Sequence, residues 1–437
     1  MHKFYNREEE TTLLKTIEKR SKESAEMTFV VGRRRVGKTA LLKKTFSTEK
    51  TLYLFAAKKN ESLLCEEFTE EITQKLDVPV YGKIDSFKQI FTLLMDVSKR
   101  EHFTLIIDEF QEFGNINHSI YSEMQNIWDS RKEASKMNLI LCGSVYSLMT
   151  KIFQNSKEPL FGRSTAQIHL KPFNIQTLKE IINDHHPNYS AEDLLAFYTF
   201  TGGIAKYVEL LVKAKAFTKK RIINELFTEN SIFLEEGKNV LIDELGKEYG
   251  NYFSVLSLIA SSKTSRSEME SVLKISVGGY LEKLEHEFNL IKKIRPFRAK
   301  PAGKNVKYRI EDNFLNFWFR FVYKYRSAVE IGNFDYLRNI LKRDYETYSG
   351  NMLEKYFRQK LMETKQFSEI SNYWDRKGIN EIDIIAVNEM EKRIVFFEVK
   401  RNKKRISLPL LKQKAKNIMN HFSGYITEYK GLSMEDM

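Results

Sequence analysis

The stretch Gly32-Arg33-Arg34-Arg35-Val36-Gly37-Lys38-Thr39 matches the pattern G-x-x-x-x-G-K-[ST] at every defined position. The β-prone run Thr28–Val31 precedes it, and Ala40–Lys44 continues it as a helix. A glycine-containing loop between a strand and a helix presents backbone N–H groups to phosphate, and the helix dipole adds to the attraction. We therefore expect residues 32 to 40, Ala40 included, to bind ATP, with Lys38 on the outer phosphates and Thr39 on Mg²⁺.

A second apolar run, Phe103–Ile107, leads directly into Asp108 and Glu109. An apolar strand that ends in a carboxylate is the metal-holding half of such a site. We expect Asp108 to hold Mg²⁺ through water and Glu109 to polarise the attacking water as the general base.

A third apolar run, Asn138–Cys142, ends in Gly143 and Ser144. The Ser144 hydroxyl either senses the γ-phosphate or the attacking water, or belongs to an ordinary turn at the end of a strand. Near the N-terminus, the aromatic residues of Phe4–Glu9 precede an expected helix, Thr11–Arg20. These aromatic side chains either pack on adenine or form a hydrophobic staple.

The chain of 437 residues carries 71 Lys and Arg against 58 Asp and Glu, a formal net charge of +13. The length predicts about three domains. The charge indicates either a polyanionic partner, most simply nucleic acid, or a lysine-rich surface. Cys65 and Cys142 follow no metal-ligand or disulfide spacing, and Cys142 is expected to be a small core residue.

Targeting signals are not evident in the sequence. The stretch Met1–Glu10 lacks the apolar core of a signal peptide, and no apolar run approaches the length of a membrane span. We therefore expect a cytoplasmic protein without a membrane partner.

The middle of the chain is helical in its periodicity. Residues 174–245 suggest a helical subdomain, and three further helices follow at Tyr252–Ala260, Arg266–Leu273 and Val277–Phe288. Ser265 or Ser267 is the expected cap of the second of these helices, and Ser276 of the third. Two β-prone runs, Leu290–Arg295 and Val306–Ile310, complete the order of a winged helix-turn-helix.

Basic residues gather between Asn289 and Ile310, where acids are absent. The eight bases are Lys292, Lys293, Arg295, Arg298, Lys300, Lys304, Lys307 and Arg309. They favour a wing that contacts DNA phosphates, whereas Glu282, Glu285 and Glu287 on the preceding helix favour a protein spacer. The aromatic segment Phe314–Tyr325 is expected to be a buried amphipathic helix, with a stacking surface as the alternative.

The last third of the chain contains a cluster of acids and a lysine. After a helical stretch, 331–365, we expect strands at Glu369–Trp374, Glu381–Val387 and Arg393–Lys400. Alternate residues of a strand share a face, so Glu398 and Lys400 lie together and Asp383 can lie beside them. With the helical Glu354, these residues suit Mg²⁺-dependent phosphodiester hydrolysis, Asp383 and Glu398 being the metal ligands. The alternative is a surface held by salt bridges.

More bases follow this cluster in the sequence. The segment after Lys400 and the expected helix Leu408–Phe422 carry Arg401, Lys403, Lys404, Arg405, Lys412, Lys414 and Lys416. They either clamp a nucleic-acid backbone or form a solvated surface.

Five segments together carry a resemblance to a known family: Phe4–Glu8, Gly32–Thr39, Asp108-Glu109, Gly143-Ser144 and Leu160–Ser164. The set resembles the archaeal-type ATPases, STAND-like relatives within the AAA+ superfamily. The resemblance implies a RecA-like parallel sheet with Arg163 near the nucleotide, either as an arginine finger, in cis or in a homo-oligomer, or in a surface salt bridge. Gly202–Tyr207 looks like the family's GG-I-P-x-Y turn, with Ala205 where proline is usual.

The Asp383, Glu398 and Lys400 pattern resembles the PD-(D/E)xK nuclease superfamily. The C-terminal domain of unknown function in the same ATPase family carries this arrangement, with a tryptophan like Trp374 before it. Both resemblances imply an α/β multidomain chain. Its expected parts are an ATPase core (1–172), a helical lid (173–245), a winged helix with an aromatic linker helix (246–328) and a restriction-endonuclease-like α/β domain (329–437).

The sequence therefore predicts an ATP- and Mg²⁺-dependent switch coupled to a metal-dependent DNA nuclease domain. The alternative is an ATP-controlled regulator that binds DNA or protein, in which the nuclease-like domain is not catalytic. A pure protein-interaction ATPase would leave the charge and the C-terminal cluster unexplained.

Overall fold

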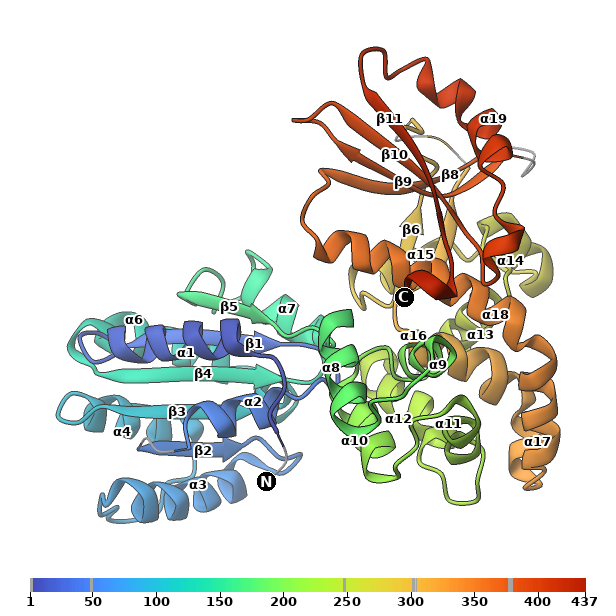
Figure 1. Cartoon of the computed structure of the whole chain (residues 1–437). Helices are drawn as coiled ribbons and strands as arrows, with labels where there is room; N and C mark the ends of the chain where they lie inside the picture. The colour runs from blue at the N-terminus through green and yellow to red at the C-terminus, as the bar shows by residue number, and fades with distance from the viewer. Residues whose placement is uncertain (1–2, 48–49, 247–248, 301–302, 304, 376–379) are drawn as a thin grey trace. The chain divides into compact units, whose positions relative to one another are not determined.

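The computed structural model, drawn in Figure 1, describes the chain except residues 1–2, 48–49, 247–248, 301–302, 304 and 376–379. It divides into two compact units, Met1–Pro172 and Phe173–Met437. Lys304, one of the bases counted above, lies outside the described residues. In the part of the chain that is described, no helix combines the length and the apolar character needed to cross a membrane.

The first unit is built on a parallel sheet with the strand order β2-β3-β4-β1-β5. The strands are β1 Glu26–Val31, β2 Thr51–Phe55, β3 Phe103–Asp108, β4 Met137–Gly143 and β5 Ala166–His169. The expected RecA-like parallel sheet is thus confirmed.

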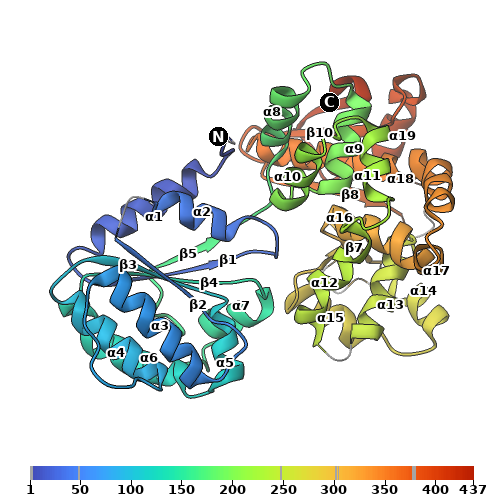
Figure 2. The same ribbon diagram turned by 90° about the horizontal axis from the view of Figure 1, so that it is seen from below.

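Helices cover both faces of this sheet, and Figure 2 shows α1 and α2 on the side opposite α3, α4 and α6. Ile106 and Ile140 pack in the cluster under α1 and α2, whereas their neighbours Leu105 and Leu139 pack in the other cluster. Because both faces are covered, the central strands β1, β3 and β4 are buried and apolar along most of their length. The helices of this unit are α1 Glu8–Arg20, α2 Lys38–Thr45, α3 Glu61–Leu76, α4 Phe87–Ser98, α5 Phe113–Ile116, α6 Ile120–Arg131 and α7 Tyr146–Gln154.

The second unit begins with a helical region. Its helices are α8 Ile175–His185, α9 Ala191–Thr201, α10 Ala205–Lys213, α11 Lys219–Leu226 and α12 Phe233–Leu245. The turn between α9 and α10 has positive φ at Gly202 (56°) and Gly203 (76°). A Cβ at Gly203 would lie 2.4 Å from the Phe173 carbonyl oxygen, so this turn needs glycine for close packing as well as for its backbone conformation.

Three helices and an antiparallel hairpin follow. They are α13 Tyr249–Ala260, α14 Arg266–Leu273, α15 Gly278–His286, β6 Ile291–Ile294 and β7 Lys307–Ile310. Ser265 caps α14 in a reciprocal capping box with Glu268. The expectation that Ser276 caps α15 is wrong, because Val277 is the N-cap residue and the Ser276 hydroxyl donates to Glu270 instead.

The aromatic segment is not the single amphipathic helix that its spacing predicts. It consists of α16 Asn313–Phe317, a π-helical turn Trp318–Val322, a 3₁₀ turn Tyr323–Tyr325 and α17 Arg326–Glu330. Helix α16 and the π-helical turn bury Phe314, Phe317, Trp318, Phe319 and Phe321. Rings from several helices enclose Phe314, Phe317 and Phe319, so this part of the segment is core, whereas Tyr323 and Tyr325 are half-buried.

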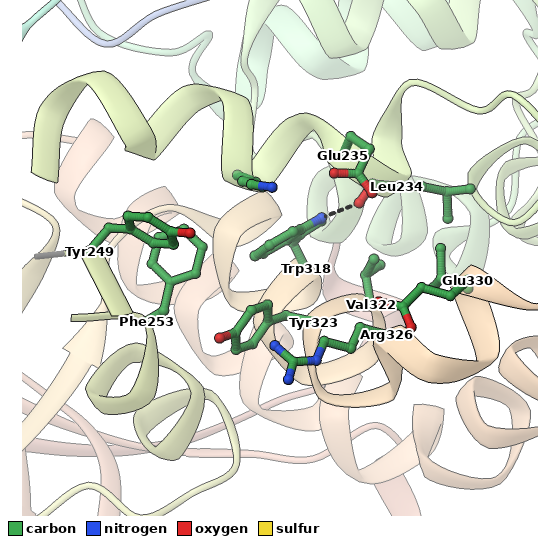
Figure 3. Close-up of a pocket in the computed structure, with 11 residues that line it drawn as sticks. Leu234, Glu235, Tyr249, Phe253, Trp318, Val322, Tyr323, Arg326 and Glu330 are labelled. Carbon is green, nitrogen blue, oxygen red and sulfur yellow. Dashed lines mark hydrogen bonds between the residues drawn. The ribbon is translucent and has the colours of Figure 1, made fainter. Parts of the chain in front are cut away.

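Trp318 also lines a cavity of about 200 Å³, whose lining residues are shown in Figure 3. Its indole Nε1 donates to the Leu234 carbonyl oxygen (2.8 Å). The other lining groups include Glu235 and Glu330 as well as Lys238 and Arg326. Since charges of both signs line it, the cavity favours no ligand of one charge.

The C-terminal part contains a four-stranded sheet with the order β11-β10-β9-β8. Its elements are α18 Phe334–Glu363, β8 Glu369–Trp374, β9 Glu381–Asn388, β10 Arg393–Val399, α19 Leu408–Met419 and β11 Ile426–Leu432. The sequence did not predict β11, which pairs in parallel with β10, whereas the other pairs are antiparallel.

The hairpin connection packs on this C-terminal sheet. Phe297 belongs to the same core cluster as Ile382 and Ile385, and its N–H donates to the Asn372 carbonyl oxygen (2.8 Å). Three bases of the expected DNA-contacting wing are paired with acids: Arg298 with Glu369 and Glu389, Lys307 with Glu381, and Arg309 with Glu311. Three of the seven described bases in this segment therefore have acidic partners.

A glycine inside α12 makes room for Trp318, because a Cβ at Gly237 would lie 2.1 Å from the indole ring. We expect Gly237→Ala to lower the free energy of unfolding by about 1–3 kcal/mol through overpacking. The measurement is urea unfolding followed by tryptophan fluorescence. Gly250→Ala in α13 is the matched control, since a Cβ there meets no atom within 4 Å. Equal stability of the two variants would contradict this packing.

Candidate functional site

The loop after β1 has the backbone shape of a phosphate cradle. Arg35 (φ 74°) and Gly37 (φ 100°) are left-handed, and a Cβ at Gly32 would lie 2.6 Å from the Leu170 carbonyl oxygen. Helix α2 starts at Lys38, and no side chain in the described part of the chain caps it. The N–H groups of its first turn can therefore bind an anion.

Lys38 lies across this loop. Its buried Nζ donates to the carbonyl oxygens of Gly32 (2.7 Å) and Arg33 (3.3 Å). The ammonium group already lies at the loop that would hold the phosphates. It can therefore exchange these carbonyl oxygens for phosphate oxygens through a small side-chain movement.

Asp108, at the end of β3, accepts hydrogen bonds on both carboxylate oxygens. Its Oδ2 accepts from the hydroxyls of Thr39 (3.0 Å) and Tyr53. Its Oδ1 accepts from Cys142 Sγ (2.8 Å) and from the Glu109 N–H (2.9 Å). The P-loop helix and three neighbouring strands therefore meet at one carboxylate.

The donors to Asp108 keep their protons. Burial, reinforced by the Asp108 carboxylate, raises the pKa of the Cys142 thiol well above its ordinary value. Burial and the hydrogen bond to Asp108 likewise raise the pKa of Tyr53. Both groups therefore remain neutral donors at physiological pH.

The sequence did not indicate Tyr53 or the hydrogen bond of Cys142 to Asp108, although the prediction that Cys142 is a core residue is confirmed. The alternation of side chains along the strands could have indicated that Cys142 and Asp108 are neighbours. Each lies two residues after an isoleucine, Ile140 or Ile106, that packs on the face covered by α1 and α2. Tyr53 packs against the same cluster from β2.

Glu109, the expected general base, is left-handed (φ 54°) and held through one oxygen. Its Oε2 accepts from Gln111 Nε2 (2.6 Å), from the Ser144 hydroxyl (2.7 Å) and from the Ser144 N–H (3.3 Å). The structure thus brings two predicted site residues together, and it adds Gln111, which the sequence had not indicated.

These residues fit ATP with Mg²⁺. The open start of α2 suits phosphate, and the Thr39 hydroxyl lies beside the Asp108 carboxylate as two hard oxygen ligands. Mg²⁺ takes one or two protein ligands and fills its shell with water and phosphate oxygens. It therefore does not need a cluster of three or more His, Cys, Asp or Glu side chains, and the described residues contain none.

Two arginines of this unit have defined partners. The Arg163 guanidinium binds the Asp129 carboxylate through Nε and Nη2 (2.8 Å for Nη2), the salt-bridge alternative weighed above. The buried Arg7 donates to the carbonyl oxygens of Val36 (3.4 Å) and Lys171 (2.7 Å). Arg7 thereby ties the N-terminal motif to the P-loop.

In the second unit, Lys400 lies between two carboxylates. Its Nζ is 3.0 Å from Asp383 Oδ2 and 3.7 Å from Glu398 Oε1. Backbone N–H groups hold both acids, that of Val399 on Asp383 and that of Ser407 on Glu398. The strands thus place the three predicted side chains together, with two carboxylates that suit one Mg²⁺ completed by water and phosphate oxygens.

Glu354, on α18, faces the same cluster. Burial, together with the Asp383 charge, raises the pKa of Glu354 to about 8. This shift favours the protonated carboxyl, whereas a bound cation would favour the charged form, so the role of Glu354 in the cluster stays a prediction.

Arg401 connects this cluster to the helical region of its own unit. Its guanidinium donates to Glu192 at the start of α9 and to Ser349 Oγ of α18 (2.7 Å). Glu192 also binds Lys219 (3.2 Å). Of the other C-terminal bases, Lys403 pairs with Glu435 (3.1 Å).

Comparisons with known families divide the chain into two matched regions. Residues 4–211 match a family described as an ATPase domain predominantly from Archaea. Residues 318–426 match a family described as archaeal and bacterial proteins of unknown function.

Individual proteins are also similar to this chain. Uncharacterized protein MJECL04 of Methanocaldococcus jannaschii is 30% identical over 407 residues, which cover 91% of this chain and 87% of the relative. The Walker-type ATPase PABY2304 of Pyrococcus abyssi has a similar fold (TM-score 0.55, 18% identity, 72% and 96% coverage). So does the ORC2 protein of Aeropyrum pernix (TM-score 0.52, 14% identity, 75% and 96% coverage).

The Tyr53 hydroxyl should orient Asp108 toward the cation. We expect Tyr53→Phe to raise the Mg²⁺ concentration for half-maximal ATP hydrolysis by about 10-fold, the low end of outer-shell effects. The measurement is a Mg²⁺ titration of steady-state hydrolysis. Tyr198→Phe is the matched control, because its buried hydroxyl donates to Gln359 Oε1 (3.0 Å) in the second unit instead. The same shift in both variants would refute the orienting role.

Proposed function

The chain belongs to the same family as its relative in Methanocaldococcus jannaschii and carries an archaeal-type ATPase domain, and from this premise we propose that it binds and hydrolyses ATP with Mg²⁺. One observation carries the proposal. The Thr39 hydroxyl of the P-loop helix lies 3.0 Å from the carboxylate that ends β3, the pairing that Mg²⁺–ATP requires.

The proposed roles follow from position. The N–H groups of residues 32–40 bind the phosphates, Lys38 neutralises the outer phosphates, and Thr39 with Asp108 holds Mg²⁺. When bound, Mg²⁺ offsets negative charge on the phosphate oxygens. Glu109 accepts the proton of a water whose oxygen bonds to the γ-phosphorus as the bond to the bridging oxygen breaks, which yields ADP and phosphate. The Aeropyrum pernix ORC2 protein forms ADPNP and ADP complexes, which supports a nucleotide in this fold.

A nuclease activity is the second candidate, favoured by the Asp383, Lys400 and Glu398 geometry. The two carboxylates would hold Mg²⁺ and Lys400 would orient water or the scissile phosphate, with DNA as the substrate. In this proposal the three helices and hairpin of residues 246–328 act as a winged helix. The bases Lys404, Arg405 and Lys416, which are exposed, contribute to backbone binding.

ATP would control this second site through the helical region. Glu192 of α9 binds Arg401, which directly follows Lys400, so a movement of α9 changes the cluster's surroundings. The rival proposal is an ATP-controlled regulator in which the same cluster only grips nucleic acid or protein. A homo-oligomer in which Arg163 leaves Asp129 to contact a neighbouring copy's nucleotide is compatible with both.

Two variants, one in the P-loop and one directly after β3, test the ATPase. We expect Lys38→Ala to lose ATP binding by at least about 10-fold because it removes the charge on the outer phosphates, and Glu109→Gln to bind ATP but lose about 10²–10⁴-fold in turnover. Binding is measured by calorimetry and turnover by phosphate release. Lys44→Ala, an exposed lysine on the same helix, is the control. Normal turnover in both test variants would eliminate the proposal.

The nuclease candidate is tested at Lys400. We expect wild-type protein with Mg²⁺ or Mn²⁺ to cut plasmid and linear DNA, and Lys400→Ala to reduce cutting by about 100-fold or more, because the cluster loses the ammonium group between its two carboxylates. Gel assays with and without ATP give the rate and the sign of the coupling. Lys404→Ala controls for lost backbone charge. Intact ATP hydrolysis without any cutting would favour the regulator.

A further inference from the structure

Gln111 is a buried side chain that the proposed hydrolysis does not use. It lies in the 3₁₀ turn Phe110–Glu112, directly after β3, and is 2% exposed. Its Nε2 donates to Glu109 Oε2 at 2.6 Å. A buried amide with a short bond to the proposed general base is a candidate for positioning that base.

One oxygen of Glu109 receives all the donors found among the described residues. Gln111 Nε2, Ser144 Oγ and the Ser144 N–H converge on Oε2 at 2.6, 2.7 and 3.3 Å. A carboxylate fixed this way cannot rotate freely, so its other oxygen keeps one direction. That second oxygen is the one left to accept a proton from water.

The place of the Gln111 amide depends on the absence of a side chain at the end of β4. A Cβ at Gly143 would lie 2.1 Å from Gln111 Oε1 and 2.6 Å from Met149 Cγ. Glycine at this position therefore admits the amide, whereas alanine would displace it.

The local geometry has an energetic cost. Gln111 Oε1 is buried without a hydrogen-bond partner in the described structure, and Glu109 adopts φ 54°. Buried unsatisfied groups and left-handed non-glycine residues are both unfavourable, and they concentrate at functional sites. Here both occur within three residues and converge on the same carboxylate.

We propose that Gln111 is a positioning residue for ATP hydrolysis: with Ser144 it fixes one oxygen of Glu109 so that the other faces the attacking water. The inference rests on the proposed ATPase function. Gln111 acts through Glu109 and does not itself contact the nucleotide.

The test compares kcat with ATP affinity. Gln111→Met keeps the length of the side chain but removes the donor, and should lower kcat by about 10- to 100-fold through misplacement of the base, with the ATP Kd unchanged within about twofold. Gly143→Ala places a Cβ where the Gln111 amide lies and should displace it. This variant should likewise lower kcat and leave the ATP Kd unchanged. Calorimetry with the non-hydrolysable analogue ADPNP supplies Kd and shows that each variant is folded.

Asn138→Leu is the matched control for loss of a buried amide. Asn138 is 1% exposed in β4, donates to Thr104 Oγ1 (3.2 Å) and, like Gln111, has a buried carbonyl oxygen without a partner in the described residues. This variant should lose stability but keep kcat. Equal kcat in Asn138→Leu and Gln111→Met would overturn the proposal.

A double-mutant cycle shows whether Gln111 acts through Glu109. In a Glu109→Ala background, Gln111→Met should change kcat by less than about twofold, because the group it positions is gone. A full additional loss in that background would overturn the positioning role. A failure of the ATPase proposal itself gives a different result from a failure of the positioning role. In that case wild type and Lys38→Ala would hydrolyse ATP equally.

Discussion

The Asp108 carboxylate is the point on which the first unit's site depends. Parallel strands place their carboxyl ends at one edge of the sheet, so β2, β3 and β4 deliver Tyr53, Asp108 and Cys142 to the same place. Thr39 adds the start of α2 to this point. A buried carboxylate is stable only when donors satisfy it, and here the same donors orient it for a cation.

In the second unit, one helix contacts parts of the three domains that the sequence predicts: the helical lid, the winged helix and the nuclease-like domain. Helix α18, 30 residues long, contacts α9 through Tyr198 and Gln359 (3.0 Å) and the end of the hairpin through Lys355 and the Glu311 carbonyl oxygen. Burial lowers the pKa of Lys355 to about 8 and that of Arg358 to about 10. Arg358 also donates to the Asp383 carbonyl oxygen (3.2 Å), so Lys355 and Arg358 on α18 connect the hairpin with the Asp383 cluster.

The sequence predicted what depends on local chemistry. The P-loop spacing, the apolar strand before Asp108 and the Glu-x-Lys alternation after Arg393 follow from residue order, and the structure places them in the expected elements. The sequence could not show that Tyr53 and Gln111 reach the site. The contact of Tyr53 with Asp108 depends on how β2 pairs with β3, and the place of Gln111 depends on the absence of a side chain at Gly143. Tertiary packing likewise broke the aromatic helix at Trp318 and placed Phe297 in the C-terminal core.

The most direct test of the proposed ATP site is a crystal structure of the protein with ADPNP and Mg²⁺. We expect Lys38 Nζ to leave the Gly32 carbonyl oxygen for the outer phosphates and Mg²⁺ to lie between Thr39 and Asp108. Asp108 should stay hydrogen-bonded to Tyr53 and Cys142, and Glu109 to Gln111 and Ser144. An empty P-loop at saturating nucleotide, or a nucleotide bound away from Thr39 and Asp108, would contradict the account.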